Sequence, residues 1–91
     1  MKGILSGLRV FDLSRGIAGP MTGMMLADHG ADVILIEPPG GDWLADVGRC
    51  RLGYRTWHRG KRAIALDLKD AKDREVFEAL ALHADVLIES Y

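Results

Sequence analysis

The sequence has little cysteine and no long hydrophobic run. Its single cysteine, Cys50, excludes a disulfide bond within the chain, which is typical of a protein of the reducing cytoplasm. A lone cysteine is more often incidental than a nucleophile, so no catalytic residue is assigned. No apolar stretch approaches the roughly 20 residues that span a bilayer. The N-terminus, MKGILSGLRVFDL, also lacks the apolar core and cleavage site of a signal peptide. We therefore expect a cytoplasmic protein with no membrane partner.

The chain also has almost no net charge, formally −1, which favours neither nucleic acid nor an anionic membrane as a partner. Its cations are nevertheless unevenly distributed. Segment 49–62 contains no acid and holds six of the twelve Lys and Arg residues, together with His58, Tyr54 and Trp57. Such a segment is either a solvated loop or an anion site, because Arg and Lys suit phosphate geometry. Aromatics among cations also stack on nucleic acid. The basic segment is short for that role, so a small phosphorylated ligand fits better.

The order of predicted elements indicates an α/β fold. Short apolar strands are expected at 8–13, 31–37, 63–68 and 84–90, and helices at 20–30 and after Asp70, which is a candidate N-cap. A long segment without a clear period separates the second and third strands. This alternation predicts a parallel sheet with flanking helices and right-handed crossovers. The second helix should pack through an apolar stripe formed by Val76, Phe77, Leu80 and Ala81.

The 91 residues end on a predicted strand that no helix follows. A parallel sheet needs cover on both faces. We therefore expect residues 1–91 to be the incomplete N-terminal part of a larger α/β domain.

Three glycines follow the first strand in RGIAGPMTGMM, where a phosphate-binding loop often lies. Gly16, Gly19 and Gly23 are spaced by three and four residues, which does not match the G-x-G-x-x-G pattern, and no Walker sequence follows. Gly19-Pro20 instead suits a helix start, with Pro20 at the first helical position. A helix N-terminus still attracts anions. A glycine inside the helix, Gly23, indicates close packing or a ligand.

Ligands of open parallel sheets bind outside the carboxyl ends of the strands. Those ends are predicted at 14–18, 37–41, 66–69 and 89–91, and Lys69 is a cation among them. Glu37 occupies the place where dinucleotide folds hold a ribose hydroxyl, but without the glycine fingerprint a solvated acid is the better interpretation. The four segments should share one edge and form one site.

The sequence resembles the start of the family III CoA-transferases, which include formyl-CoA transferase, the carnitine CoA-transferase and the α-methylacyl-CoA racemases. The resemblance covers essentially the whole chain. It rests on four stretches in the same order as in the family. They are the Ala-Gly-Pro tripeptide after LSGLRVFDLS, then GADVILIEPPGGD, then RGKRAIALDLKD, and finally ADVLIESY.

The resemblance implies a large Rossmann-like domain with a second, smaller domain, in two chains interlocked as a homodimer. Members transfer CoA between carboxylic acids through an aspartyl anhydride and then an aspartyl-CoA thioester, whereas the racemases use a histidine and an aspartate. All these catalytic residues lie beyond position 91. The substrates expected are acyl-CoA and a carboxylic acid, with no metal. Alternatives are an acyl-CoA racemase and a catalytically inactive truncated fragment.

The resemblance also implies contacts with CoA. They lie after the first strand, in the LDLK segment against the nucleotide end of CoA, and at the end of the chain: Arg15, Ile17, Ala18; Leu66, Asp67, Leu68, Lys69; Ser90 and Tyr91. One departure stands out. Many members carry an arginine after the glutamate of the second strand, where this chain has Pro38. The basic segment 49–62 is a candidate source of the missing positive charge.

Overall fold

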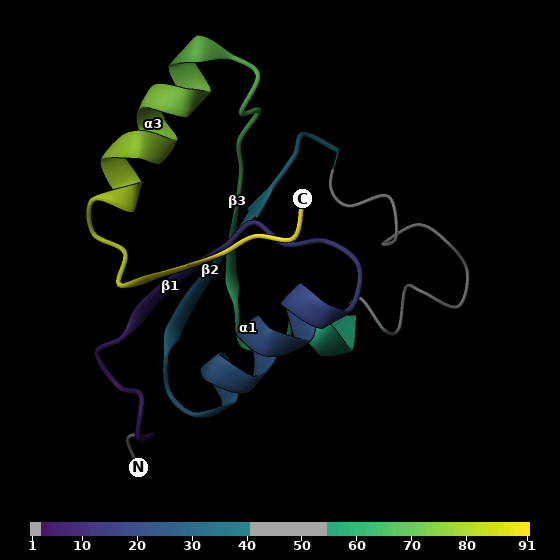
Figure 1. The fold of residues 1–91 in the computed structure, drawn as a ribbon, viewed down its shortest axis with the longest axis vertical. Coiled ribbons are helices and arrows are strands. Elements are labelled where there is room, and N and C mark those ends of the chain that lie inside the picture. The colour runs from purple at the N-terminus through teal and green to yellow at the C-terminus, as the bar shows by residue number, and fades with distance from the viewer. Residues whose placement is uncertain (1–2, 41–54) are drawn as a thin grey trace.

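The computed structural model describes residues 3–40 and 55–91, and its elements follow the predicted order (Figure 1). They are β1 (Arg9–Asp12), α1 (Ala18–Asp28), β2 (Asp32–Glu37), β3 (Arg62–Ala65), α3 (Ala71–Ala81) and β4 (Val86–Ile88). Within the segment expected to lack regular structure, residues 55–57 are helical. The α/β class and the flanking helices are confirmed.

The strands form one sheet in the order β3-β2-β1-β4, and every neighbouring pair is parallel. Phe11 in β1 stands beside Ile34 in β2 and Leu87 in β4, and Ile36 stands beside Ile64 in β3. The apolar run of β2 is inside the sheet, as a strand buried on both faces should be. Because the strands are parallel, all four carboxyl ends lie at the same edge.

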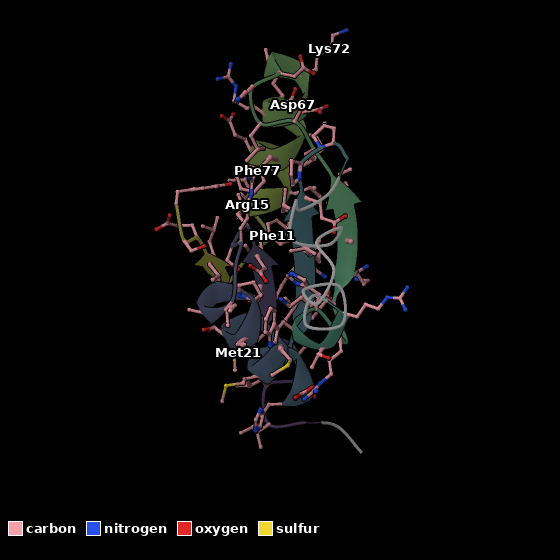
Figure 2. The ribbon with its side chains drawn as sticks, turned by 90° about the vertical axis from the view of Figure 1, so that its right-hand side faces the viewer. Phe11, Arg15, Met21, Asp67, Lys72 and Phe77 are labelled. Atoms are coloured by element: carbon pink, nitrogen blue, oxygen red, sulfur yellow. The ribbon has the colours of Figure 1, made fainter. Side chains whose placement is uncertain are left out.

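Alternate residues of β1 face opposite sides of the sheet and build two cores. On one side, Phe11 and Leu13 pack with Phe77 and Leu80 of α3, and the Phe11 and Phe77 rings lie 6.4 Å apart (Figure 2). On the other side, Val10 and Val33 pack with Leu26 and Ala27 of α1. Figure 1 shows the two helices on either side of the strands. Each helix thus covers one face and leaves the carboxyl edge open.

Helix α1 (Ala18–Asp28) begins and ends two residues earlier than the predicted helix at 20–30. Gly30 has a φ of 103°, and its N–H bonds the Ala27 carbonyl while that of Ala31 bonds the Leu26 carbonyl. This is the Schellman arrangement that glycine favours. Pro20 is the third helical residue and not the first, because the helix begins at Ala18. That position is still in the first turn, where N–H groups have no helical partner.

Two methionines of helix α1, Met21 and Met25, do not form its packing face. Met21 and Met25 are 38% and 56% exposed, whereas Gly19, Pro20 and Gly23 are buried. The small residues let the helix approach the sheet. A Cβ added at Gly19 would lie 2.2 Å from the Ser14 Cβ.

Two details of α3 differ from expectation. Val76 is 45% exposed and lies outside the stripe that packs on the core, which Phe77, Leu80 and Ala81 form. Asp70 occupies the N-cap position, but its side chain makes no capping bond. Instead, the carboxylate of Asp73 in the first turn accepts the N–H of Asp67 at 2.8 Å. The acid at the helix start is thus used to fix the preceding loop.

An ion pair is buried between α1 and the sheet. The Lys61 Nζ donates to Asp12 Oδ2 at 2.6 Å, and the two side chains are 1% and 0% exposed. The ammonium also donates to the Pro20 carbonyl at 3.0 Å and to His58 Nδ1 at 2.8 Å. The other Asp12 oxygen accepts the backbone N–H and the hydroxyl of Ser14. Every charge-bearing atom is therefore hydrogen-bonded, as burial requires.

Gly23→Ala should destabilise the protein by about 1–3 kcal/mol, although alanine normally favours a helix. A Cβ at Gly23 would lie 2.8 Å from Asp12 Oδ2 and 3.0 Å from Lys61 Nζ, so it would push the ion pair apart. Urea denaturation measures the effect. As a control, Thr22→Ala on the exposed side of α1 should change stability little. An equally stable or more stable Gly23→Ala variant would contradict this packing.

Candidate functional site

A cleft of about 720 Å³ opens at the carboxyl edge of the sheet. Residues at or after the ends of the four strands line it: Arg15 after β1, Ile36 to Pro39 at the end of β2, Leu66 to Lys69 after β3, and Tyr91 after β4. This is the place where open parallel sheets bind ligands. The fold therefore gathers segments far apart in the sequence into one concave surface.

The structure brings six of the nine predicted contact residues to the wall of this cleft. They are Arg15, Leu66, Asp67, Leu68, Lys69 and Tyr91. Ile17 and Ala18 are not among its lining residues; they lie at the start of α1, where no side-chain cap is made, and Ile17 is 54% exposed. Ser90 does not line the cleft either. It is hydrogen-bonded to Arg15, which does line the cleft.

Ser90 holds the backbone of Arg15 from the neighbouring strand end. The Arg15 N–H donates to Ser90 Oγ at 3.1 Å, and the Ser90 hydroxyl donates to the Arg15 carbonyl at 3.3 Å. The Arg15 guanidinium lies over the Tyr91 ring, with Cζ 5.9 Å from its centroid. That distance is within the range of a cation–π contact. The ends of β1 and β4 are therefore joined at the cleft, with an arginine and an aromatic ring at its surface.

The LDLK segment is fixed in shape by hydrogen bonds that its backbone N–H groups donate. The N–H of Leu66 donates to the Glu37 carbonyl at 2.8 Å, which continues the pairing of β2 with β3. The N–H of Lys69 donates to Asp67 Oδ1 at 3.0 Å. The exposed Lys69 therefore stands on a turn whose backbone is held by hydrogen bonds within the chain.

The residues from the end of β2 were not assigned from the sequence as contacts. Ile36, Glu37, Pro38 and Pro39 line the cleft because β2 lies next to β1 and β3 and its end meets theirs. The signal was available, since 37–41 was one of the predicted strand ends. Glu37 is half-buried there and makes interactions of its own. Among the described residues, the cleft wall carries two cations, Arg15 and Lys69, and two acids, Glu37 and Asp67.

The described part of the basic segment contains Arg55, Arg59, Lys61 and Arg62, and none of these cations lines the cleft. Three of its cations are paired with aspartates of the first half of the chain. Arg59 donates to Asp28 at 2.7 Å and Arg62 to Asp32 at 2.7 Å, while Lys61 is buried against Asp12. The hydrogen bond from Arg59 lowers the pKa of Asp28, although that carboxylate is exposed. The positive charges of these three residues are therefore compensated by aspartates within the chain. Arg49, Cys50, Arg51 and Tyr54 lie outside the described residues.

Burial lowers the pKa of Lys61, and the hydrogen bond and charge of Asp12 act in the opposite direction.

Within 3–40 and 55–91, no group of three or more His, Cys, Asp or Glu side chains is arranged to hold a metal ion. In the same residues, no helix has the length and apolarity needed to cross a membrane.

Comparison with known proteins identifies relatives of this arrangement. The chain is 42% identical to the succinyl-CoA:mesaconate CoA-transferase of Haloarcula hispanica, over 98% of this chain and 25% of that protein. It is 39% identical to the human succinyl-CoA:glutarate CoA-transferase, over 96% of this chain and 21% of that protein. The crystal structure of a CAIB/BAIF family protein from Brucella suis matches with a TM-score of 0.92 and 35% identity.

That crystal structure covers all of this chain, and the chain covers 26% of it. The chain thus spans about a quarter of the length of the relatives that it matches. The family model of CoA-transferase family III matches residues 5–91, which is almost the entire sequence. The motif series and the sheet with its open carboxyl edge agree with that match, and the chain belongs to CoA-transferase family III.

Proposed function

We propose that this chain is the N-terminal, CoA-binding part of an enzyme that transfers CoA between carboxylic acids. The observation that carries the proposal is the cleft at the carboxyl edge, where Arg15, Lys69 and Tyr91 meet from three strand ends. Lysine and arginine suit the phosphates of CoA, and an aromatic ring suits its adenine. The Haloarcula hispanica and human relatives named above are CoA-transferases, which supports transfer over racemisation.

In this proposal the described residues bind and orient CoA, and the chemistry is done elsewhere. Arg15 and Lys69 supply charge-assisted hydrogen bonds to the phosphates, while Leu66, Asp67 and Leu68 form the adjoining wall. Ile17 and Ala18 lie where α1 begins, close in sequence to Arg15, and stay proposed contacts of CoA. The aspartate that carries the acyl and CoA groups is proposed to lie beyond Tyr91, so no catalytic residue is assigned within this chain.

The same proposal extends to assembly and location. We place the enzyme in the cytoplasm, as a homodimer in which the rest of the polypeptide and a second copy pack around this part. Apolar side chains that remain exposed support such packing: Met25 on α1 and Leu87 on β4 are 56% and 48% exposed.

Isothermal titration of CoA into the complete gene product tests the proposed function. We expect saturable binding, with competition by acyl-CoA. Transfer activity is then assayed with a panel of acyl-CoA donors and carboxylic acids. A folded protein that binds no CoA at millimolar concentration would refute the proposal. Epimerisation of an α-methylacyl-CoA without transfer would identify the racemase alternative instead.

A further inference from the structure

The connection 14–17 between β1 and α1 carries Arg15, one of the two cations on the described cleft wall. Its first residue, Ser14, is polar but only 3% exposed. Ser14 lines a small cavity that shares Arg15 and Pro38 with the cleft, but it is not among the described residues that line the cleft itself. A buried hydroxyl needs a hydrogen-bond partner, so the role of Ser14 has to be sought inside the chain.

One oxygen of Asp12 accepts both hydrogen bonds that Ser14 donates. Asp12 Oδ1 accepts the backbone N–H of Ser14 at 2.9 Å and also the Ser14 hydroxyl. An aspartate that accepts the N–H two residues further on forms an Asx turn. Hydrogen bonds to a carboxylate are stronger than those to a neutral acceptor, so the backbone at Ser14 is firmly held.

The Asp12 carboxylate is itself held through its other oxygen. Asp12 Oδ2 accepts from Lys61 Nζ at 2.6 Å, and the same ammonium donates to the Pro20 carbonyl at 3.0 Å. Pro20 lies in the first turn of α1. The buried ion pair therefore joins the end of β1 to the start of α1, and Ser14 lies on the short connection between these two points.

The contacts around Arg15 leave its backbone little freedom. Gly16, directly after it, has a φ of 84°, which glycine adopts without strain. Ser90 Oγ accepts the Arg15 N–H at 3.1 Å. Before it, Ser14 is packed closely on α1, because a Cβ added at Gly19 would lie 2.2 Å from the Ser14 Cβ. These neighbours set the point from which the Arg15 side chain reaches the cleft wall.

We propose that Ser14 is a positioning residue of the CoA site: bound to the buried Asp12, it holds the backbone of Arg15 in place for a charge-assisted contact with a phosphate of CoA. This inference rests on the proposed function, because Ser14 acts through a proposed contact and does not itself touch CoA. Two other roles compete with it. One is a purely structural hydrogen bond that stabilises the fold, and the other is a direct contact between Ser14 and CoA.

A double-mutant cycle on CoA affinity separates these three roles. Ser14→Ala removes the hydroxyl and keeps the backbone N–H that Asp12 accepts. Arg15→Ala removes the side chain that Ser14 is proposed to position. Both single variants and the double variant are made in the complete gene product, and CoA titration and thermal unfolding are measured for each. Ser14→Cys is the conservative variant, because it keeps a weak S–H donor in nearly the same volume.

Ser14→Ala should weaken CoA binding about threefold to tenfold, and Ser14→Cys should weaken it less. In the Arg15→Ala background, Ser14→Ala should cause no further loss of affinity, because the side chain that it positions is already absent. An equal loss in both backgrounds would show a direct contact of Ser14 with CoA and would overturn the inference. If Ser14→Ala does not fold, the same cycle is measured with Ser14→Cys, and the same non-additivity is expected.

A destabilised control excludes a general effect of stability. Leu26→Ala removes core volume next to the start of β2, so it should lower thermal stability and leave CoA affinity unchanged. Unchanged CoA affinity in folded Ser14→Ala, or in folded Arg15→Ala, would overturn the inference, while CoA binding by the natural protein upheld the proposed function. No CoA binding by the natural protein would overturn both.

Discussion

Lys61→Met should be the most destabilising single substitution considered for this chain, with a loss of about 3–5 kcal/mol in the free energy of unfolding. Methionine fills much the same space, but it leaves the Asp12 carboxylate 0% exposed without the ammonium that compensates it. The Pro20 carbonyl and His58 Nδ1 also lose their donor. Urea denaturation of the complete gene product measures the effect.

Two comparisons isolate the cause of that loss. Arg59 forms an ion pair of 2.7 Å with Asp28, close to the 2.6 Å of the buried pair, but both side chains are exposed, so Arg59→Ala should cost much less than Lys61→Met. Asp12→Asn keeps an oxygen to accept from Ser14 and removes the negative charge. Combined with Lys61→Met, it should cost clearly less than the two single changes added together. Strict additivity, or equal losses from Lys61→Met and Arg59→Ala, would contradict the buried pair's role.

Lys69→Ala in the complete gene product should weaken CoA binding by about 1.5–3 kcal/mol, roughly 10- to 150-fold, by removing a charge-assisted hydrogen bond to phosphate. Lys69 is an exposed cation on the cleft wall, and its backbone is held by Asp67. Because the side chain makes no internal ion pair shorter than 4.0 Å with the other described residues, stability should change little. Calorimetric titration gives both the affinity and the stoichiometry.

Lys72 provides the matched control for this substitution. It is an exposed lysine three residues further along the chain, in the first turn of α3, and it does not line the cleft (Figure 2). Lys72→Ala removes the same charge from nearly the same region and should leave CoA affinity almost unchanged. If Lys72→Ala and Lys69→Ala weakened binding equally, the effect would be one of net charge. An unchanged dissociation constant for Lys69→Ala would remove that residue from the site.

The sequence was sufficient for the order of elements, because each carries a strong local signal. The continuous apolar run of β2 and the stripe of α3 predict their types directly, and Gly30 predicts the end of α1. Parallel pairing follows from the alternation of strands and helices. Once the sheet is parallel, the strand ends must meet, and so the position of Lys69 at the cleft was also predictable.

The side-chain partners were not predictable, because they join residues distant in sequence. Asp12 and Lys61 are 49 positions apart, and nothing local distinguishes Lys61 from the other cations of segment 49–62. Two indirect signals existed: Asp12 directly after the apolar Val10 and Phe11 at the end of β1, and Gly23 within a helix. The aspartate indicates a buried charge, and the glycine indicates that the helix lies close to a neighbouring group. The exposure of Val76 and of the α1 methionines depends on what covers each helix, which periodicity does not tell.

A crystal structure of the complete gene product with CoA bound would test the central claim most directly. We expect the nucleotide end of CoA in the cleft formed by the four strand ends, with phosphate oxygens within hydrogen-bond distance of Arg15 or Lys69 and the adenine near Tyr91. Density for CoA at any other surface, with this cleft empty or filled by a segment of the protein, would contradict the account.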